Sequence, residues 1–308
     1  MDRPVVTYNL ASVDGRLTLA PGVSLLTGDD RWTELTSRIG DPYEWVRQAH
    51  DPQVLLEGSG SFLTGDAQPG AASGAHLGLH CLPDCVVDVP GRRWFAVVDG
   101  RGRVDLQFTG WPDPGWAGWH ALVLTSGAAS PDHLARLRER GIPYLVVGNG
   151  RVDLPAAMSL VHSELGVRTV VCTGGGRLGG ALLRAGLVDE VDIDTLPVVI
   201  GGRGTPALFD APVLGPDEWP HRLDLLTVEQ PVGGRQRLRY MVVGRGTETG
   251  VGPIDGHRPR DGAVTSSSRL AEPRGWGTSE RALLAPAARH VAWLSGNVGA
   301  LPCHVPTA

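Results

Sequence analysis

Residues 167–204 read VRTVVCTGGGRLGGALLRAGLVDEVDIDTLPVVIGGRG, and this stretch decides the fold. The apolar residues before the triple glycine are typical of a buried parallel strand. Residues 177–185 predict a helix that Gly186 ends, and residues 191–200 predict a second strand that a second glycine turn closes. This order predicts that the positive end of the helix dipole points at the triple glycine, a position that binds anions.

The two glycine turns of this stretch have two interpretations. Gly174, Gly175 and Gly176 lack a Cβ atom, so their backbone N–H groups can approach a phosphate or a ring closely. Two such turns at strand ends suggest a nucleotide pocket. Glycines are also the ordinary residues of tight turns, and the turns alone do not decide between the two interpretations.

Composition and charge exclude several classes of protein. The chain has 308 residues, a formal net charge of −5 and a pI near 6.0, which argues against a general nucleic-acid binder. All 28 basic residues are arginine, which excludes both a Schiff-base lysine and a complete P-loop. No run of about 18 apolar residues occurs, so we expect no membrane span. Four cysteines in a chain that starts without a signal-peptide core predict a cytoplasmic protein.

The rest of the chain alternates predicted strands with predicted helices. Strands are expected at residues 4–11, 53–57, 94–99, 121–125 and 142–147, and helices at residues 30–39, 43–49, 131–140 and 154–165. Residues 104–108 are expected to pair with the strand before them as a hairpin, and residues 223–229 and 236–243 to form an antiparallel pair. The pattern predicts an α/β fold with a mostly parallel central sheet and an antiparallel C-terminal hairpin.

Two segments have a different composition. Residues 65–90 are rich in Gly, Ala and Pro and predict a long loop. Residues 244–308 are polar and rich in Gly, Pro and Ser, so we expect a largely disordered tail after a domain of residues 1–243.

Three motifs resemble the reductase domain of riboflavin biosynthesis. The first is the opening strand from Arg3, which is followed by Ser-Val-Asp-Gly-Arg at residues 12–16. The second is the glycine turn followed by AGLVDE at residues 185–190, and the third is PVVIGG at residues 197–202. The similarity covers about residues 3–243 in the same order. It implies a three-layer fold of the dihydrofolate-reductase type.

The resemblance implies an NADPH-dependent reductase of the 5-amino-6-(5-phosphoribosylamino)uracil reductase type. Such an enzyme transfers hydride to C1′ of the open-chain sugar imine and needs no metal. It would act on a small pyrimidine nucleotide-like substrate, without nucleic acid or membrane as partner, and we expect a homodimer. The alternatives are a diverged member that binds a nucleotide without catalysis, and a reductase of another pterin-like or pyrimidine-like substrate.

The resemblance also implies which residues form the site. Asn9, Ser12 and Asp14 would meet the substrate and nicotinamide, with Asp14 as an orienting or proton-relaying group. Asp14 could equally cap its own turn, and Thr125-Ser126 could be a plain turn rather than a contact for the 2′-phosphate. The candidate cofactor-binding residues are Gly58, Gly60, Thr125, Ser126, Gly174, Gly175, Gly176, Arg177 and Leu178.

The chain departs from the family pattern at three places. Tyr8 stands six residues before Asp14, where the family usually has Lys or Asn, and Thr173 stands where the family usually has Glu. Residues 64–90 lack the Asp-Pro and Arg-Pro that the family uses for the substrate phosphate. These departures concern the exact substrate more than the type of reaction.

Two side-chain clusters have both a functional and an ordinary interpretation. One could bind zinc but matches no strong motif, so we interpret it as incidental; it comprises His76, His80, Cys81 and Cys85. The other could stack on a ring or seal a dimer, and we favour a cover over a hydrophobic edge; it comprises Trp111, Trp116 and Trp119.

Overall fold

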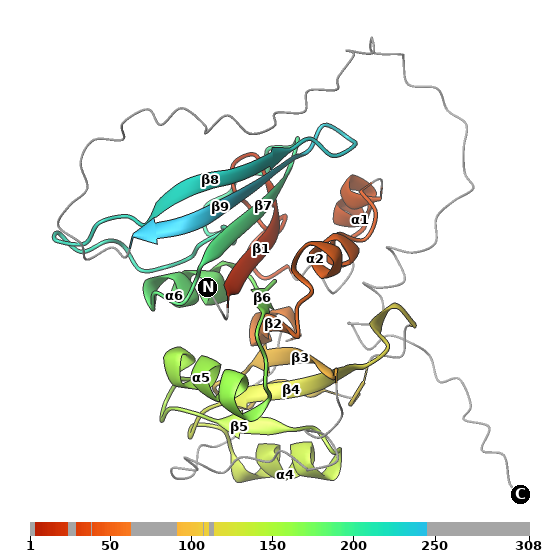
Figure 1. Ribbon diagram of the computed structural model, residues 1–308, viewed down its shortest axis with the longest axis vertical. Coiled ribbons are helices and arrows are strands. Elements are labelled where there is room, and N and C mark those ends of the chain that lie inside the picture. The colour runs from red at the N-terminus through yellow and green to blue at the C-terminus, as the bar shows by residue number, and fades with distance from the viewer. Residues whose placement is uncertain are drawn as a thin grey trace, which may run out of the picture.

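The computed structural model describes residues 4–23, 29–37, 39–62, 91–106, 108–110 and 114–244. Within these ranges nine strands form one sheet in the order β5-β4-β3-β2-β6-β1-β7-β9-β8 (Figure 1). The strands are β1 (Val5–Ser12), β2 (Val54–Gly58), β3 (Arg93–Val98), β4 (Trp119–Thr125), β5 (Tyr144–Val146), β6 (Val170–Cys172), β7 (Glu190–Leu196), β8 (Arg222–Glu229) and β9 (Gln236–Gly244).

The sheet is parallel from β5 to β7 and antiparallel at its far end. β1 lies between β6 and β7 and pairs with both in parallel, and β2 pairs in parallel with β3 and β6. β9 runs antiparallel to β7, and β8 runs antiparallel to β9. The predicted fold class, a mostly parallel sheet with an antiparallel C-terminal hairpin, is therefore confirmed.

Four of the five α-helices in the described residues begin after a capping side chain. The carboxylate of Asp41 accepts a hydrogen bond from the Tyr43 backbone, and the hydroxyl of Ser130 accepts one from the His133 backbone. Each of these caps is followed by a proline at the first helical position, where a missing N–H costs nothing. The helices are α1 (Asp30–Thr36), α2 (Pro42–His50), α4 (Pro131–Glu139), α5 (Leu154–Glu164) and α6 (Gly176–Arg184), and two short 3₁₀ turns are η2 (Ser59–Ser61) and η3 (Pro114–Trp116).

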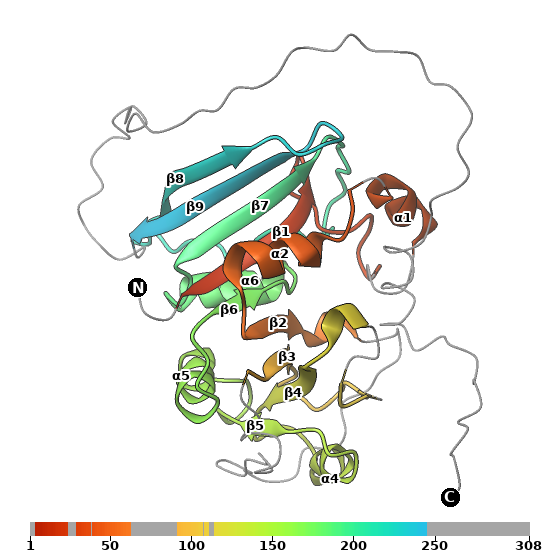
Figure 2. The same cartoon turned by 45° about the vertical axis from the view of Figure 1, so that its right-hand side comes forward.

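Helices cover both faces of the sheet, which gives three layers. α5 and α6 bury Met158, Val161 and Leu182 on one face, among side chains that include Leu56 of β2. α2 and α4 pack on the other face, where the buried side chains include Val46, Leu134, Leu137, Leu55 and Val123. Figure 2 shows α2 and α6 on opposite sides of β1. Alternate residues of β2 thus enter different cores, because successive side chains of a strand point to opposite faces.

Two predicted strands differ from the structure. The described residues of the range 104–108 do not pair with β3, because β2 and β4 already occupy both edges of that strand. Instead the carboxylate of Asp99 accepts hydrogen bonds from the backbone of Arg103 and Val104, and Val104 is buried in the core. The strand expected at residues 191–200 ends at Leu196, before Pro197, which has no N–H to donate.

The predictions for residues 65–90 and 245–308 lie outside the described residues. Among the helices of the described ranges, none is both long and apolar enough to cross a membrane.

Candidate functional site

The candidate site lies where the carboxyl ends of β2, β6 and β1 meet. These three strands are neighbours in the sheet and parallel, so the segments that follow them leave from the same edge. The amides of Thr173 and Gly174 both donate to the carbonyl of Leu56 at 3.1 Å, which fastens the glycine turn to β2. α6 begins directly after this turn, so its N-terminus lies at the edge, as the sequence predicts.

The three glycines of the turn differ in how much space a side chain would have. A Cβ on Gly174 would lie 2.9 Å from the amide nitrogen of Gly58, and a Cβ on Gly176 would overlap the carbonyl oxygen of Ala207. A Cβ on Gly175 would meet nothing within 4 Å. Gly174 and Gly176 are therefore required by packing within the chain, whereas Gly175 is exposed and leaves open space at the helix N-terminus.

The two residues after the turn lie on opposite sides of it. Arg177 is exposed, and Leu178 is buried against Gly174, whose added Cβ would lie 3.0 Å from the Leu178 side chain. Gly58 ends β2 against the same leucine, while Gly60 in η2 is exposed with open space around it. The structure therefore brings Gly58, Gly174, Gly175, Gly176, Arg177 and Leu178 together at one corner.

Asn9 connects β1 to this corner. Its side chain is only 7% exposed, and its Nδ2 donates to the carbonyl oxygen of Gly174 at 3.3 Å. The side chain thus fixes the glycine turn from the side opposite β2.

Asp14 anchors a turn with both carboxylate oxygens. It accepts hydrogen bonds from the backbone of Ile200 at 3.0 Å and Gly201 at 2.7 Å, and from the hydroxyl of Ser12 at 2.7 Å. The Ile200 amide, followed by the Ser12 hydroxyl, lowers the pKa of Asp14 to about 2. Asp14 is therefore ionised at neutral pH, and its geometry favours the turn-capping interpretation over a proton relay.

Thr125 and Ser126 lie at the end of β4, and both are fully buried. Their hydroxyls donate to the carbonyls of Asp99 at 2.7 Å and Gly100 at 2.6 Å. In this conformation the two side chains stabilise the strand end, and any contact with a cofactor here would come from neighbouring groups.

Sequence reasoning missed Glu57, the last buried residue of β2. Its side chain is 4% exposed, and its carboxylate accepts hydrogen bonds from Thr173 Oγ1 at 2.6 Å, Ser61 Oγ at 3.3 Å and the Tyr43 hydroxyl at 3.5 Å. Burial raises the pKa of Glu57 to about 7, against the opposing effect of these hydroxyl donors. The available signal was a charged residue at the end of an otherwise apolar strand.

The position of Glu57 changes the meaning of one departure from the family pattern. Thr173 stands where the family usually has Glu, so the sequence suggests that a carboxylate is missing before the glycine turn. In the structure, the hydroxyl of Thr173 touches the carboxylate of Glu57 from the neighbouring strand. This corner of the site therefore has a carboxyl group, although a different strand supplies it.

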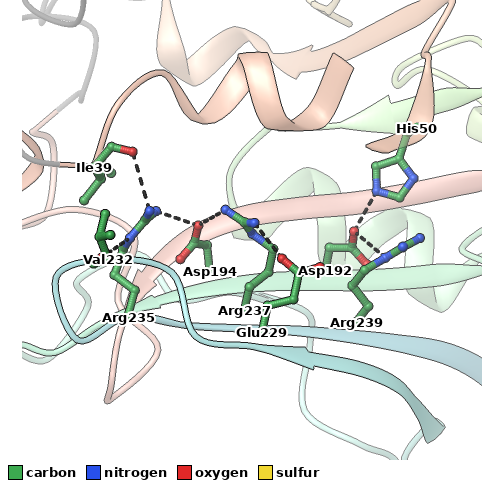
Figure 3. A network of polar contacts seen from close by, with 9 residues as sticks. All are labelled: Ile39, His50, Asp192, Asp194, Glu229, Val232, Arg235, Arg237 and Arg239. Atoms are coloured by element: carbon green, nitrogen blue, oxygen red, sulfur yellow. Dashed lines mark hydrogen bonds and ion pairs between the residues drawn. The ribbon is translucent and has the colours of Figure 1, made fainter. Parts of the chain in front are cut away.

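A second feature missed from the sequence is a row of buried ion pairs between β7 and β9 (Figure 3). Asp192 lies opposite Arg239 and Asp194 opposite Arg237 in the antiparallel register. Asp194 accepts from Arg237 at 2.9 Å and from Arg235 at 2.8 Å, and both arginine side chains are nearly buried. The sequence indicates these pairs by its alternating acids in DID at residues 192–194 and its alternating arginines in RQRLR at residues 235–239.

The row of ion pairs also connects the hairpin to α2. His50 contacts Asp192 at 2.6 Å, and the guanidinium of Arg237 lies 3.9 Å from the centre of the Trp45 ring. Tyr8 packs against Trp45 with ring centres 5.4 Å apart, and burial, followed by the charge of Asp194, raises the pKa of its hydroxyl. At the position of the family's Lys or Asn the chain thus has a neutral ring in a structural network.

The tryptophan cluster covers the core where the structure describes it. Trp116 and Trp119 are buried, pack edge to face with ring centres 5.3 Å apart, and Arg47 lies over Trp116. Trp111 lies outside the described residues, as do His76, His80, Cys81 and Cys85.

Together these features define an α/β protein with a candidate site at the carboxyl edge of a parallel sheet, where a glycine turn opens a helix. The chain belongs to the RibD C-terminal domain family, whose model matches residues 4–230. The predicted family is therefore confirmed.

A similar curated protein is the 2,5-diamino-6-ribosylamino-4(3H)-pyrimidinone 5′-phosphate reductase of Methanothermobacter thermautotrophicus. It is 28% identical over 213 residues, which are 68% of this chain and 84% of that protein. A pyrimidine reductase-like protein from Corynebacterium diphtheriae has a similar structure, with a TM-score of 0.54 and 16% identity over 79% of this chain and 92% of that chain. RibD from Acinetobacter baumannii has a TM-score of 0.50 and 20% identity, with 79% and 59% covered.

The packing of the glycine turn predicts opposite outcomes for neighbouring substitutions. We expect Gly176→Ala to lower the free energy of unfolding by roughly 3 kcal/mol, because the new methyl group overlaps the Ala207 carbonyl. The matched control Gly175→Ala should cost at most about 1 kcal/mol, the difference between Gly and Ala before a helix. Urea denaturation of the three proteins measures both values, and equal stabilities would contradict the packing argument.

The buried carboxyl of Glu57 predicts a pH-dependent effect on stability. Its pKa is higher in the folded protein than the ordinary value of 4.5, so folding favours the protonated form. The resulting stability is complete below about pH 4.5 and is lost as the pH rises to about 7. We therefore expect Glu57→Gln to gain about 3 kcal/mol relative to the wild-type chain between about pH 4.5 and about pH 8.

The measurement is urea denaturation of both proteins at several pH values. A constant difference between them across this range would show that Glu57 is not the group that titrates.

Proposed function

We propose that the protein is an NADPH-dependent reductase of a ribosylaminopyrimidine 5′-phosphate. The observation that carries the proposal is the open corner at Gly175, where the start of α6, the end of β2 and Asn9 of β1 converge in a member of the RibD C-terminal domain family. The name of the Methanothermobacter relative supports a 2,5-diaminopyrimidinone as substrate. The corresponding 5-aminouracil is the second substrate to test.

We infer that the corner would hold the phosphates of a dinucleotide. Open space at Gly175 lets a phosphate approach the first amides of α6, where the helix dipole favours negative charge. The exposed Gly60 and the end of β2 at Gly58 would form the neighbouring wall, and the exposed Arg177 would add a positive charge. Leu178, which is buried against Gly174 and Gly58, would support the turn from beneath.

A preference for NADPH over NADH would come from exposed arginines beside the end of β4. Arg101 follows Gly100, whose carbonyl accepts the hydrogen bond from Ser126, and the backbone of Arg151 packs against Gly100. Guanidinium groups suit a 2′-phosphate because they bind it with two parallel hydrogen bonds. Thr125 and Ser126 would then shape this end of the pocket rather than bind the phosphate themselves.

When bound, NADPH supplies the hydride that reduces C1′ of the open-chain sugar imine. The chain's own residues would position the reactants: Asn9 holds the glycine turn, and Ser12 and Asp14 hold the turn at residues 200–201. Such positioning is the main contribution that a protein makes to hydride transfer.

A second candidate function is nucleotide binding without catalysis. Thr173 in place of the family's Glu favours it, because a missing carboxylate would remove a contact to the substrate. The contact between Thr173 and Glu57 weakens this argument, since the corner retains a carboxyl group.

The experiment measures binding and turnover separately. We expect calorimetry to give a micromolar or lower Kd for NADPH and at least about tenfold weaker binding of NADH, the loss expected for about one charge-assisted contact. Addition of the 2,5-diaminopyrimidinone or the 5-aminouracil substrate should consume NADPH absorbance steadily. Binding without consumption would favour the second candidate, and no binding at micromolar protein would contradict both.

We also propose a cytoplasmic homodimer. β8 is the terminal strand of the sheet in the described chain, all of its residues are exposed, and several are apolar: Leu223, Leu225, Leu226 and Val228. An unpaired apolar edge strand is a template for pairing with a second copy. The buried free thiol of Cys172 agrees with a reducing compartment.

The dimer proposal predicts the effect of one charge on β8. We expect Leu225→Glu to convert the dimer to a monomer, because the new charge would be buried against the second copy. Leu225 is 54% exposed in the single chain. Val213→Glu is the matched control, since Val213 is 93% exposed and lies outside the strand. Sedimentation velocity measures both, and a wild-type chain that sediments as a monomer would contradict the proposal.

A further inference from the structure

Glu57 lies where three elements of the site join. It ends the buried part of β2, its oxygens reach Thr173 directly before the glycine turn, and Ser61 in η2 contacts it from the other segment of the corner. Thr173 is half-buried, whereas Glu57 is almost completely buried. The threonine hydroxyl thus lies between the carboxyl group and the open edge of the sheet.

No ion pair with Glu57 occurs among the described residues, and the titratable groups around it are neutral. Tyr43 faces it from α2 and the thiol of Cys172 lies in β6, and burial raises the pKa of both. Asp41, whose charge helps to raise the pKa of Tyr43, pairs with Arg47 at 3.1 Å, and Arg103 donates to Ser59 of η2 at 3.2 Å. The carboxyl group is therefore held by hydroxyl groups rather than by a counter-ion.

The two carboxyl groups of this edge have different environments. Asp14 is partly exposed and bound by two backbone amides, which stabilise the ionised form. Glu57 is buried and bound by three hydroxyls, and a hydroxyl can accept a hydrogen bond from a protonated carboxyl group as well as donate to an ionised one. Only Glu57 of this pair can hold a proton near neutral pH.

We propose that Glu57 is the proton source of the site and that it acts through the hydroxyl of Thr173. Glu57 holds the proton, and Thr173 relays it to the substrate. The inference rests on the proposed reductase function. It assigns the source of the proton for the reduction to Glu57, which lies outside the three sequence motifs.

The proton balance of the reduction fits this arrangement. The imine carbon gains a hydride and the imine nitrogen gains a proton, so each turnover consumes one proton. Thr173 Oγ1 gives its proton toward the nitrogen and takes the proton of Glu57 across the 2.6 Å contact. The resulting Glu57 carboxylate accepts hydrogen bonds from the same hydroxyls and is protonated again from water.

The first test compares the wild-type chain with Glu57→Gln, which has nearly the same shape and cannot titrate. The single-turnover rate of NADPH consumption should fall in the wild-type chain as the pH rises through about 7, because the protonated fraction falls. The variant should be about 100-fold slower and should have no such decrease, while its affinity for NADPH stays within about twofold.

The second test separates the relay from a structural role. Thr173→Val removes the hydroxyl and should lower the rate by a factor similar to that of Glu57→Gln, whereas Thr173→Ser restores the hydroxyl and should restore most of the rate. Melting temperatures of both variants control for folding. Equal rates for Thr173→Val and Thr173→Ser would overturn the relay.

The third test needs neither cofactor nor turnover. The infrared difference spectrum between the wild-type chain and Glu57→Gln should contain the carbonyl band of a protonated carboxylic acid, which disappears with a midpoint near pH 7. Absence of this band at neutral pH would overturn the inference, as would a Glu57→Gln variant with the wild-type rate and pH profile. A wild-type chain that shows the band but does not consume NADPH would contradict the proposed function instead.

Discussion

The close approach of the glycine turn to the end of β2 is the constraint on which the site depends. There is no room for a Cβ between Gly174 and the amide of Gly58, and the Gly176 backbone packs against Ala207 in the same way. Because the turn is held this tightly, the first turn of α6 has a fixed position at the carboxyl edge of the sheet. Gly175, between these two contacts, is the residue of the turn at which an added Cβ would meet nothing within 4 Å.

The same approach also explains the environment of Glu57. Since the turn is fastened to Leu56 through two backbone hydrogen bonds, Thr173 must lie over the end of β2, where the carboxyl group of Glu57 is buried beneath it. A buried carboxylate without a counter-ion is costly, and its protonated form is correspondingly favoured. The packing of the backbone therefore favours the protonated form of Glu57, a residue that lies outside the glycine motif.

Local patterns predicted the elements well and their pairing less well. The caps at Ser130 and Asp41 and the glycine turn are local features, so the sequence predicted α4, α2 and α6 to within a residue or two. The hairpin expected for residues 104–108 was wrong because the neighbours of β3 come from distant parts of the chain. Periodicity describes a strand, but it does not say which strands occupy its edges.

Contacts between neighbouring strands also explain why the site was predicted only in part. The backbone groups of the corner follow from glycines that are visible in the sequence, whereas the partnership of Glu57 and Thr173 joins residues that are 116 positions apart. The ion pairs of β7 and β9 depend in the same way on an antiparallel register that no local pattern fixes. The order of the strands therefore decides whether a buried acid has a basic partner. The arginines of β9 pair with the buried acids of β7, and these ion pairs are structural. β2 lies between parallel strands, so its one buried acid lies next to hydroxyl groups and can exchange a proton.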